Sequence, residues 1–187
     1  MLVTFRKRLV LVGCLAGLGW AAGPSALWID VPFVKQERNG CGAASAAMIV
    51  QYWERQHGNP QGDLSDASKI QKALYSDQAH GIYASSLERY FGEHGFRTFA
   101  FQGTWGDLKL HIEKGRPLIV ALKPRTGKEL HYVVVVGVDE ARKLVFVNDP
   151  AERKLLEREW QEFEGEWKDP HFWTLLVLPQ QGGDSVR

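Results

Sequence analysis

The chain has 187 residues, of which 44% are hydrophobic, and its 23 Lys and Arg residues nearly balance its 22 Asp and Glu residues. This length suits one ordinary domain, and the apolar fraction with balanced charge excludes an intrinsically disordered chain. The sequence has no basic stripe typical of nucleic-acid binding and no Gly-rich nucleotide-binding motif. Its two cysteines, Cys14 and Cys41, are too few for a disulfide-stapled scaffold.

The first 26 residues have the organisation of a secretory signal. Arg6-Lys7-Arg8 is a basic cluster, and the apolar stretch that follows over residues 9–22 is shorter than the roughly 20 residues of a membrane-spanning helix. Small residues before Leu27 provide a cleavage site near Ala26. We therefore expect residues 1–26 to be removed during export to the periplasm or the medium, leaving residues 27–187 as a single domain.

An alternative is a lipoprotein signal that ends before Cys14. Leu11-Val12-Gly13-Cys14 resembles a bacterial lipobox, although the apolar stretch continues past the cysteine. Contact with a membrane is expected only if Cys14 carries this lipid. If the signal is removed at Ala26, Cys41 becomes the only thiol of an exported protein, and it then has no internal partner for a disulfide.

The first half of the mature chain predicts mainly helices. An extended segment over residues 28–35 precedes a helix over 41–57, which is rich in alanine and is stopped by Gly58-Asn59-Pro60. Two further helices, over 65–74 and 85–94, each begin at a serine that we expect to be the N-cap. Residues 96–101 predict a strand, and Thr104 with Asp107 is the capping pattern of a helix ending near Gly115.

The second half predicts strands rich in β-branched and aromatic residues. They cover residues 117–122, 132–138, 144–147 and 172–178, and a charged helix over about 156–167 precedes the last strand. Val133 to Val136 are apolar on both faces, which indicates a central strand covered on both sides. Helices followed by an antiparallel sheet predict an α+β fold of two layers.

Gln36 and Cys41 form the first candidate site feature. Cys41 lies in the first turn of an apolar helix, where free backbone N–H groups and the helix dipole favour a thiolate. Gly40 and Gly42 leave room for a substrate chain, and the Gln36 side-chain amide lies in the preceding loop, where it would form an oxyanion hole with the Cys41 N–H. Taken alone, Cys41 suits a small buried side chain better than a nucleophile, and Gln36 suits a solvated loop residue.

His131 and Asp149 complete the candidate site. His131 begins the most apolar strand, and Asp149 follows the next strand, where its carboxylate would orient the imidazole. Asn148 competes for this role, but adjacent strand residues point to opposite faces, so only one of the two can point at His131. A structural histidine and a simple Asn-Asp-Pro turn are the alternatives for these positions.

In this combination the sequence resembles the papain-like cysteine peptidases, in particular the C39 family of bacteriocin-processing peptidases. The resemblance extends from Val31 to about Leu178 and rests on Val31-Pro-Phe-Val-Lys-Gln36, Cys41-Gly-Ala-Ala-Ser, His131-Tyr-Val-Val-Val-Val-Gly and Asp149-Pro150. It implies a papain-like fold in which Cys41 is the nucleophile, His131 the general base and acid, Asp149 the orienting acid, and Gln36 the oxyanion donor.

Members of the family commonly form the N-terminal domain of an ATP-binding cassette exporter and cut leader peptides after Gly-Gly. The resemblance therefore implies a peptide or protein substrate and exporter components as partners, with no cofactor. The histidines have no second ligand at metal-binding spacing, so we expect no metal site. Two alternatives keep the same fold: a thiol enzyme that transfers an acyl or amide group, and a non-catalytic peptide-binding module of an export or envelope system.

Overall fold

The computed structural model describes residues 26–58, 62–126 and 129–180. The predicted signal sequence up to residue 25, and the lipobox with Cys14, lie outside these described residues. Within the described residues, seven strands form one antiparallel sheet in the order β2-β7-β3-β4-β5-β6, and β1 pairs with β4. The strands are β1 (Leu27–Trp28), β2 (Phe96–Gln102), β3 (Leu118–Leu122), β4 (His131–Asp139), β5 (Leu144–Asn148), β6 (Leu156–Glu159) and β7 (Trp173–Pro179).

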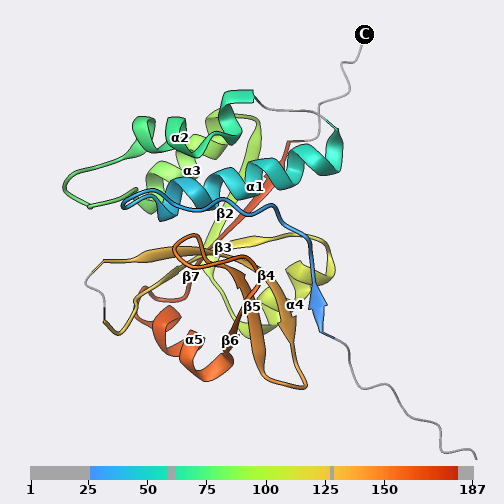
Figure 1. Ribbon diagram of the computed structural model, residues 1–187. Coiled ribbons are helices and arrows are strands. Elements are labelled where there is room, and N and C mark those ends of the chain that lie inside the picture. Colours follow the sequence, from blue (N-terminus) through green and yellow to red (C-terminus); the bar gives the residue numbers. More distant parts are fainter. Residues whose placement is uncertain (1–25, 59–61, 127–128, 181–187) are drawn as a thin grey trace, which may run out of the picture.

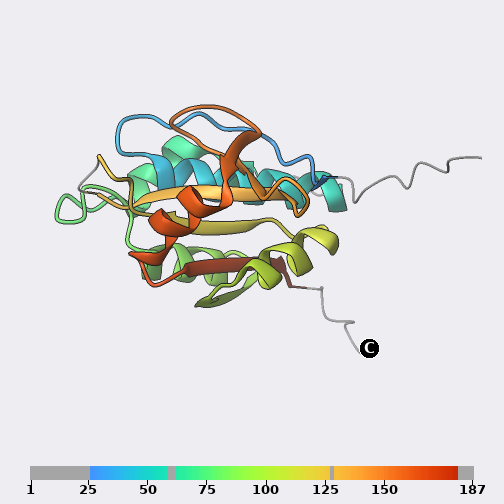
Figure 2. The same cartoon turned by 90° about the horizontal axis from the view of Figure 1, so that it is seen from below.

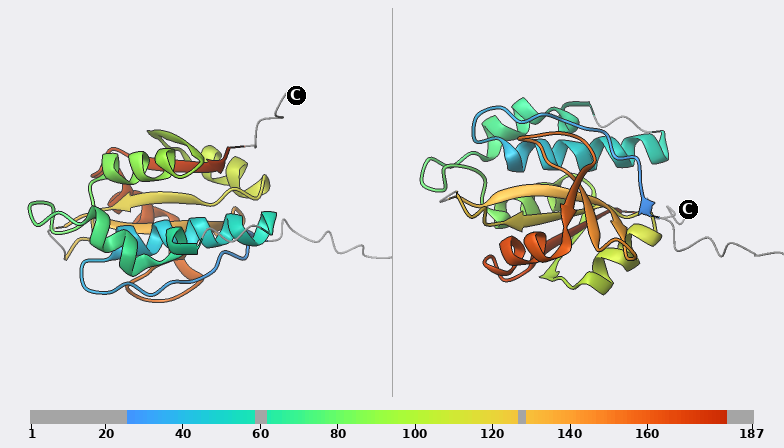
Figure 3. Two further views of the ribbon diagram at one scale, coloured as in Figure 1. Left: turned by 90° about the horizontal axis from the view of Figure 1, so that it is seen from above. Right: turned by 60° about the horizontal axis from the view of Figure 1, so that its bottom comes forward.

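Helices cover both faces of this sheet (Figure 1). The helices are α1 (Cys41–His57), α2 (Ala67–Leu74), α3 (Ala84–Glu93), α4 (Trp105–Glu113) and α5 (Trp160–Lys168), with a short 3-10 helix η1 (Gly62–Ser65). The α1–α3 group lies over one face, while α4 and α5 lie over the other (Figures 1 and 3). The α+β class is confirmed, but the expected two layers are three, because the second face of the sheet is also apolar and needs a cover.

The central position predicted for the valine run is confirmed. β4 lies between β3 and β5, and its side chains alternate between two apolar clusters. Val134 and Val136 belong to the cluster that includes α1, whereas Val133 and Val135 belong to the cluster that includes α4 and α5. Because every second residue enters a different core, the strand has no polar face.

Helix α1 occupies the range predicted for it and carries the N-terminal site residue. The small side chains of the Ala-rich face are fully buried, which allows the helix axis to lie close to the sheet. The helix ends at Gly58, whose φ of 64° is left-handed and whose N–H donates to the carbonyl of Glu54. Helix α1 packs against β4, and the N-terminus of the helix lies at the same end of the sheet as the start of this strand (Figure 2).

The two predicted serine caps are wrong. The α2 cap is Asp66, whose carboxylate accepts from the N–H groups of Ser68 and Lys69, because Ser65 instead closes the 3-10 turn through Gly62. The α3 cap is Tyr83, with no side-chain cap hydrogen bond. A carboxylate one residue downstream competed with Ser65, and the sequence pattern did not distinguish them. The capping box of α4, formed by Thr104 and Asp107, is confirmed.

The segment predicted as one charged helix over 156–167 is a strand followed by a helix. β6 pairs antiparallel with β5 from Leu144↔Glu159 to Val147↔Leu156, and α5 starts at Trp160. β6 lies at the edge of the sheet, where charged side chains are common and hide the alternating pattern of a strand. Within the described residues, no helix combines the length and apolar character needed to cross a membrane.

Candidate active site

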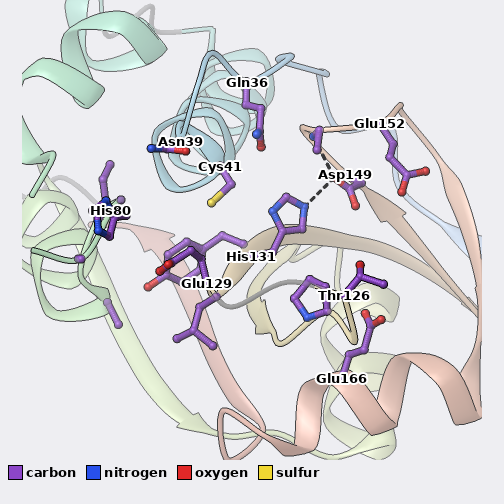
Figure 4. A pocket seen from close by; sticks show the side chains of 18 of the residues that line it. Gln36, Asn39, Cys41, His80, Thr126, Glu129, His131, Asp149, Glu152 and Glu166 are labelled. Carbon is purple, nitrogen blue, oxygen red and sulfur yellow. Dashed lines mark hydrogen bonds and ion pairs between the residues drawn. The ribbon is translucent and has the colours of Figure 1, made fainter. Parts of the chain in front are cut away.

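Three chain segments meet at one end of the central strands and line a cleft of about 1040 Å³. They are the start of α1, the start of β4 and the loop that follows β5. Cys41, His131 and Asp149 come from these segments in that order, and Gln36 comes from the loop before α1 (Figure 4). All four residues predicted from the sequence therefore line the same cleft.

Cys41 is the first residue of α1, is half-buried, and forms no disulfide. The N-cap Gly40 has no side chain to cap the first turn, so no side-chain oxygen competes with the thiol for the N–H groups there. Gly42 differs from expectation. A Cβ atom at this position would lie 3.1 Å from the Cβ of Ile82 and 3.3 Å from the Tyr132 ring, so Gly42 allows tight packing rather than substrate entry.

His131 connects the thiol to Asp149. Its Nε2 lies 2.7 Å from Oδ1 of Asp149, and the opposite side of the ring faces the sulfur of Cys41 (Figure 4). Figure 4 shows the imidazole between the sulfur and the carboxylate. The same Oδ1 accepts from the Ala151 N–H at 2.9 Å, which fixes the carboxylate at the start of the loop.

Asn148 points away from this site. It is fully buried on the opposite side of β5, where its side chain bonds to backbone groups of Val31, Pro32 and Leu155. The alternation of side chains along a strand accounts for this difference between two neighbours. Asp149, and not Asn148, is thus the carboxylate or amide that contacts His131.

The electrostatics of the pair favour its charged form. Burial by itself lowers the pKa of His131, but hydrogen bonds and charge interactions with Asp149 and Cys41 outweigh burial and raise this pKa to about 10. Burial also works to raise the pKa of Asp149, yet the hydrogen bond and charge of His131 hold it below its usual value. Imidazolium and carboxylate therefore stabilise each other at neutral pH.

Gln36 lies on the other side of the thiol. Its backbone N–H donates to the carbonyl of Pro150 at 2.9 Å, which anchors it beside the Asp149 loop. The side chain extends towards Cys41 in Figure 4. Its Oε1 is buried and has no hydrogen-bond partner among the described residues. The unpaired atom is the acceptor oxygen of the amide, and this amide lies in the region next to the sulfur (Figure 4).

Other walls of the cleft carry no motif and were not predicted from the sequence. The turn between α2 and α3 contributes His80 and Tyr83, and Leu130 lies in the segment before β4. The turn is closed by paired hydrogen bonds between the backbones of Ser76 and Gly81. Its composition resembles any solvated loop, so only the fold places it at the site.

A further wall consists of a largely buried ion pair between α5 and β6. Arg158 bonds to Glu166 at 2.9 Å, and their side chains are 14% and 10% exposed. Among the described residues, no group of three or more His, Cys, Asp or Glu side chains is arranged to hold a metal ion.

Solved structures with the same fold include several peptidase domains. A protein described as a C39-like peptidase from Bacillus anthracis matches with a TM-score of 0.65 and 16% identity, covering 85% of this chain and 100% of that one. The peptidase domain of Streptococcus ComA, a bi-functional ABC transporter involved in a quorum sensing pathway, has a TM-score of 0.62 and 20% identity, covering 81% and 100%.

A third structure is a double glycine motif protease from an AMS/PCAT transporter in complex with the leader peptide. It has a TM-score of 0.59 and 20% identity, covering 81% of this chain and 94% of that one. At these identities the likeness establishes the fold, which is the one expected from the resemblance noted above. No curated protein matches the sequence. The profile of the family described as Peptidase_C39 like matches residues 28–172, so the chain belongs to this peptidase family.

Proposed function

We propose that the protein is a cysteine peptidase in which Cys41 is the nucleophile, His131 the general acid and base, Asp149 the orienting carboxylate and Gln36 an oxyanion donor. The observation that carries this proposal is the position of His131, which contacts Asp149 through Nε2 at 2.7 Å and lies between this carboxylate and the Cys41 sulfur (Figure 4). An orienting group, a base and a nucleophile in this order are what thiol acyl transfer requires.

The reaction uses each group in turn. The Cys41 thiolate attacks the carbonyl carbon of the scissile peptide bond, and the resulting oxyanion is stabilised by the Cys41 N–H and the Gln36 amide. His131 then gives its proton to the leaving nitrogen, which departs as an amine and leaves a thioester. His131 next takes a proton from water, whose oxygen attacks the thioester, and the carboxylic acid leaves while the Cys41 thiolate and the His131 imidazolium are restored.

Peptide cleavage by the purified chain tests this assignment. Mature protein starting at residue 27 should cleave a peptide, with fragment masses that account for the addition of one water molecule. Cys41→Ala and His131→Ala should each reduce the rate by orders of magnitude while the protein remains folded. Activity retained in Cys41→Ala would contradict the proposal. Transfer to an added amine in place of water would instead favour the acyl-transfer alternative.

Two of the structural neighbours suggest a substrate class. One is a transporter peptidase domain, and another is a double glycine motif protease bound to a leader peptide. We propose that this chain also cuts leader peptides after Gly-Gly, in association with exporter components. A peptide with Gly-Gly before the cut site should be cleaved much faster than the same peptide with Ala-Ala, and equal rates would remove this substrate class.

We also propose that the protein is exported to the periplasm or beyond, with the signal removed after Ala26. This position is compatible with the described fold, because Leu27 and Trp28 already pair with β4. N-terminal sequencing of protein from the producing cell should give Leu27 as the first residue. A mature protein that begins with a lipid-modified Cys14 would support membrane anchoring, and a chain that keeps Met1 in the cytoplasm would contradict export.

A further inference from the structure

Asn148 is a polar side chain that is completely buried and uses both ends of its amide. Nδ2 donates to the carbonyl of Val31 at 3.2 Å and to that of Pro32 at 3.4 Å. Oδ1 accepts from the N–H of Leu155 at 3.0 Å. Replacing this amide is costly, because the carbonyls of Val31 and Pro32 and the N–H of Leu155 would each lose a hydrogen bond in the interior of the protein.

These bonds join two segments that are far apart in the sequence. We call residues 27–36 the N-terminal strap and residues 149–155 the acidic-site loop. The strap starts at β1, continues through a bond from the Ile29 N–H to the Val136 carbonyl, and ends at Gln36. Figures 1 and 2 show the strap next to the loop. An ion pair of Asp30 with Lys154 is a further link between them.

The loop needs the Asn148 side chain to close. The last β5–β6 backbone pair is Val147↔Leu156, so Asn148 and Leu155 would be the next pair, but Leu155 has a φ of 54° and leaves the ladder. The Asn148 Oδ1 takes the place of the missing backbone acceptor for Leu155. A left-handed leucine is a strained backbone conformation, and this bond helps to offset the strain.

Gln36 is held between the same two segments. It is the end of the strap, and its N–H donates to the Pro150 carbonyl of the acidic-site loop. The position of the Gln36 side chain relative to Cys41 therefore depends on how the strap and the loop are joined. Asn148 is the fully buried group that joins them.

We infer that Asn148 is a positioning residue for the reaction: by fixing the strap to the acidic-site loop it sets the Gln36 amide at the place where the oxyanion forms. This inference rests on the function proposed above. Asn148 itself contacts neither the thiol nor the imidazole, so it acts through Gln36. Its loss should impair steps that pass through an oxyanion more than steps that need only the thiolate.

Two reactions of Cys41 separate these effects. Acetylation by p-nitrophenyl acetate forms a thioester and releases p-nitrophenolate through a tetrahedral oxyanion. Alkylation by iodoacetamide displaces iodide at an sp³ carbon and forms no oxyanion. Asn148→Ala should slow acetylation by up to about 10²-fold, because small displacements of positioning groups have effects of this size. The alkylation rate at the same pH should change by less than a few fold.

A double-mutant cycle tests the route. Gln36→Ala should slow acetylation on its own, and Asn148→Ala should add little in a Gln36→Ala background, because both remove the same donor. Independent, multiplicative losses would overturn the inference, and so would equal losses of acetylation and alkylation. Should Asn148→Ala fail to fold, Asn148→Ser, which keeps a hydroxyl near the strap, is expected to lose less acetylation rate with the same selectivity for the oxyanion step.

Tyr52→Phe is the matched control. Tyr52 is also buried, and its hydroxyl donates to the Gly115 carbonyl at 2.7 Å, near the opposite end of α1 from Cys41. This variant should lose stability without a selective loss of acetylation.

Wild-type protein that is alkylated but never acetylated would contradict the peptidase proposal itself. Normal acetylation of the wild type together with an unchanged acetylation rate in Asn148→Ala would contradict only the positioning role.

Discussion

Two adjacent residues at the end of β5 show how a strand separates roles. Asp149 faces His131, and Asn148 faces the buried strap, although both are short, polar and next to each other. Their side chains reach different faces because strand residues alternate. The sequence allowed either residue as the partner of His131, and the geometry assigns Asp149 to that contact.

Substitution of Asp149 by Asn should reduce kcat/KM by orders of magnitude, with ~10⁴-fold as the extreme known for such a change in a serine triad. Asn keeps the size and an acceptor oxygen but loses the charge that stabilises the imidazolium. The folded protein should persist, as judged by its thermal unfolding. Asp139→Asn is a matched control, because Asp139 is an almost buried carboxylate at the far end of β4 that pairs with Arg142. Equal losses in the two variants would remove the role of Asp149.

Cys41 should react rapidly with iodoacetamide at about pH 6 in the chain that starts at residue 27. The pKa of His131 is raised to about 10, so its imidazolium lies beside the sulfur at this pH and assists the attack on the reagent (Figure 4). One equivalent should be incorporated, and peptidase activity should fall in parallel. His131→Ala should slow the reaction, because the positive partner is lost. Labelling that becomes fast only in denaturant would instead indicate an ordinary buried thiol.

At the scale of elements, β1 depends on one glycine of β4. A Cβ at Gly137 would lie 2.7 Å from both the Leu27 carbonyl oxygen and the Trp28 Cβ, and 3.0 Å from the Phe146 ring. The two-residue strand can pair there because nothing projects from Gly137. The strap is therefore attached to the sheet at a position where any side chain would separate them.

Gly137→Ala should accordingly destabilise the protein by about 1–3 kcal/mol, as overpacking usually does. The Ile29 amide, which donates to the Val136 carbonyl at 2.8 Å, should exchange its hydrogen faster. Gly92→Ala is the control: it lies in α3 with open space around it, and should be neutral or stabilising by up to about 1 kcal/mol. Unchanged stability and exchange in Gly137→Ala would show that β1 does not need this close contact.

The elements that the sequence predicted well have patterns that only one structure satisfies. The capping pair of Thr104 and Asp107, the alanine-rich α1 and the valine run of β4 belong to this group. β6 was missed because its charged residues suit a helix surface as well as a sheet edge. The site residues were identifiable through their residue types at element ends, whereas the cleft walls at His80 and Tyr83 depend on long-range packing that no local pattern encodes.

At the scale of the whole molecule, the active site joins parts that fold against different layers. Cys41 belongs to the helical layer over one face of the sheet, while His131 begins strand β4 and Asp149 directly follows strand β5. The interaction of the His131 imidazole with Asp149 and Cys41 therefore exists only in the folded protein and contributes to its stability. Its strength should appear in the pH dependence of unfolding.

The sign of this dependence follows from both shifts. The pKa of His131 rises from 6.5 to about 10 on folding, so its stabilising contribution is complete below pH 6.5 and is lost as the pH rises towards 10. The pKa of Asp149 falls below 3.8, so its contribution is present above pH 3.8 and is lost as the pH falls. The pair should stabilise the fold most between these two limits.

Urea unfolding of the wild type and Asp149→Asn across this pH range provides the measurement. The difference in unfolding free energy should be largest between about pH 4 and 6.5 and should shrink steadily above pH 6.5, because Asn cannot hold the proton on His131. In a Cys41→Ala background this difference should disappear at a lower pH as the pH rises, because one of the two groups that raise the pKa of His131 is gone. A difference that stays constant from pH 5 to about 10 would mean that Asp149 does not shift the titration of His131, and the ion pair would have to be abandoned.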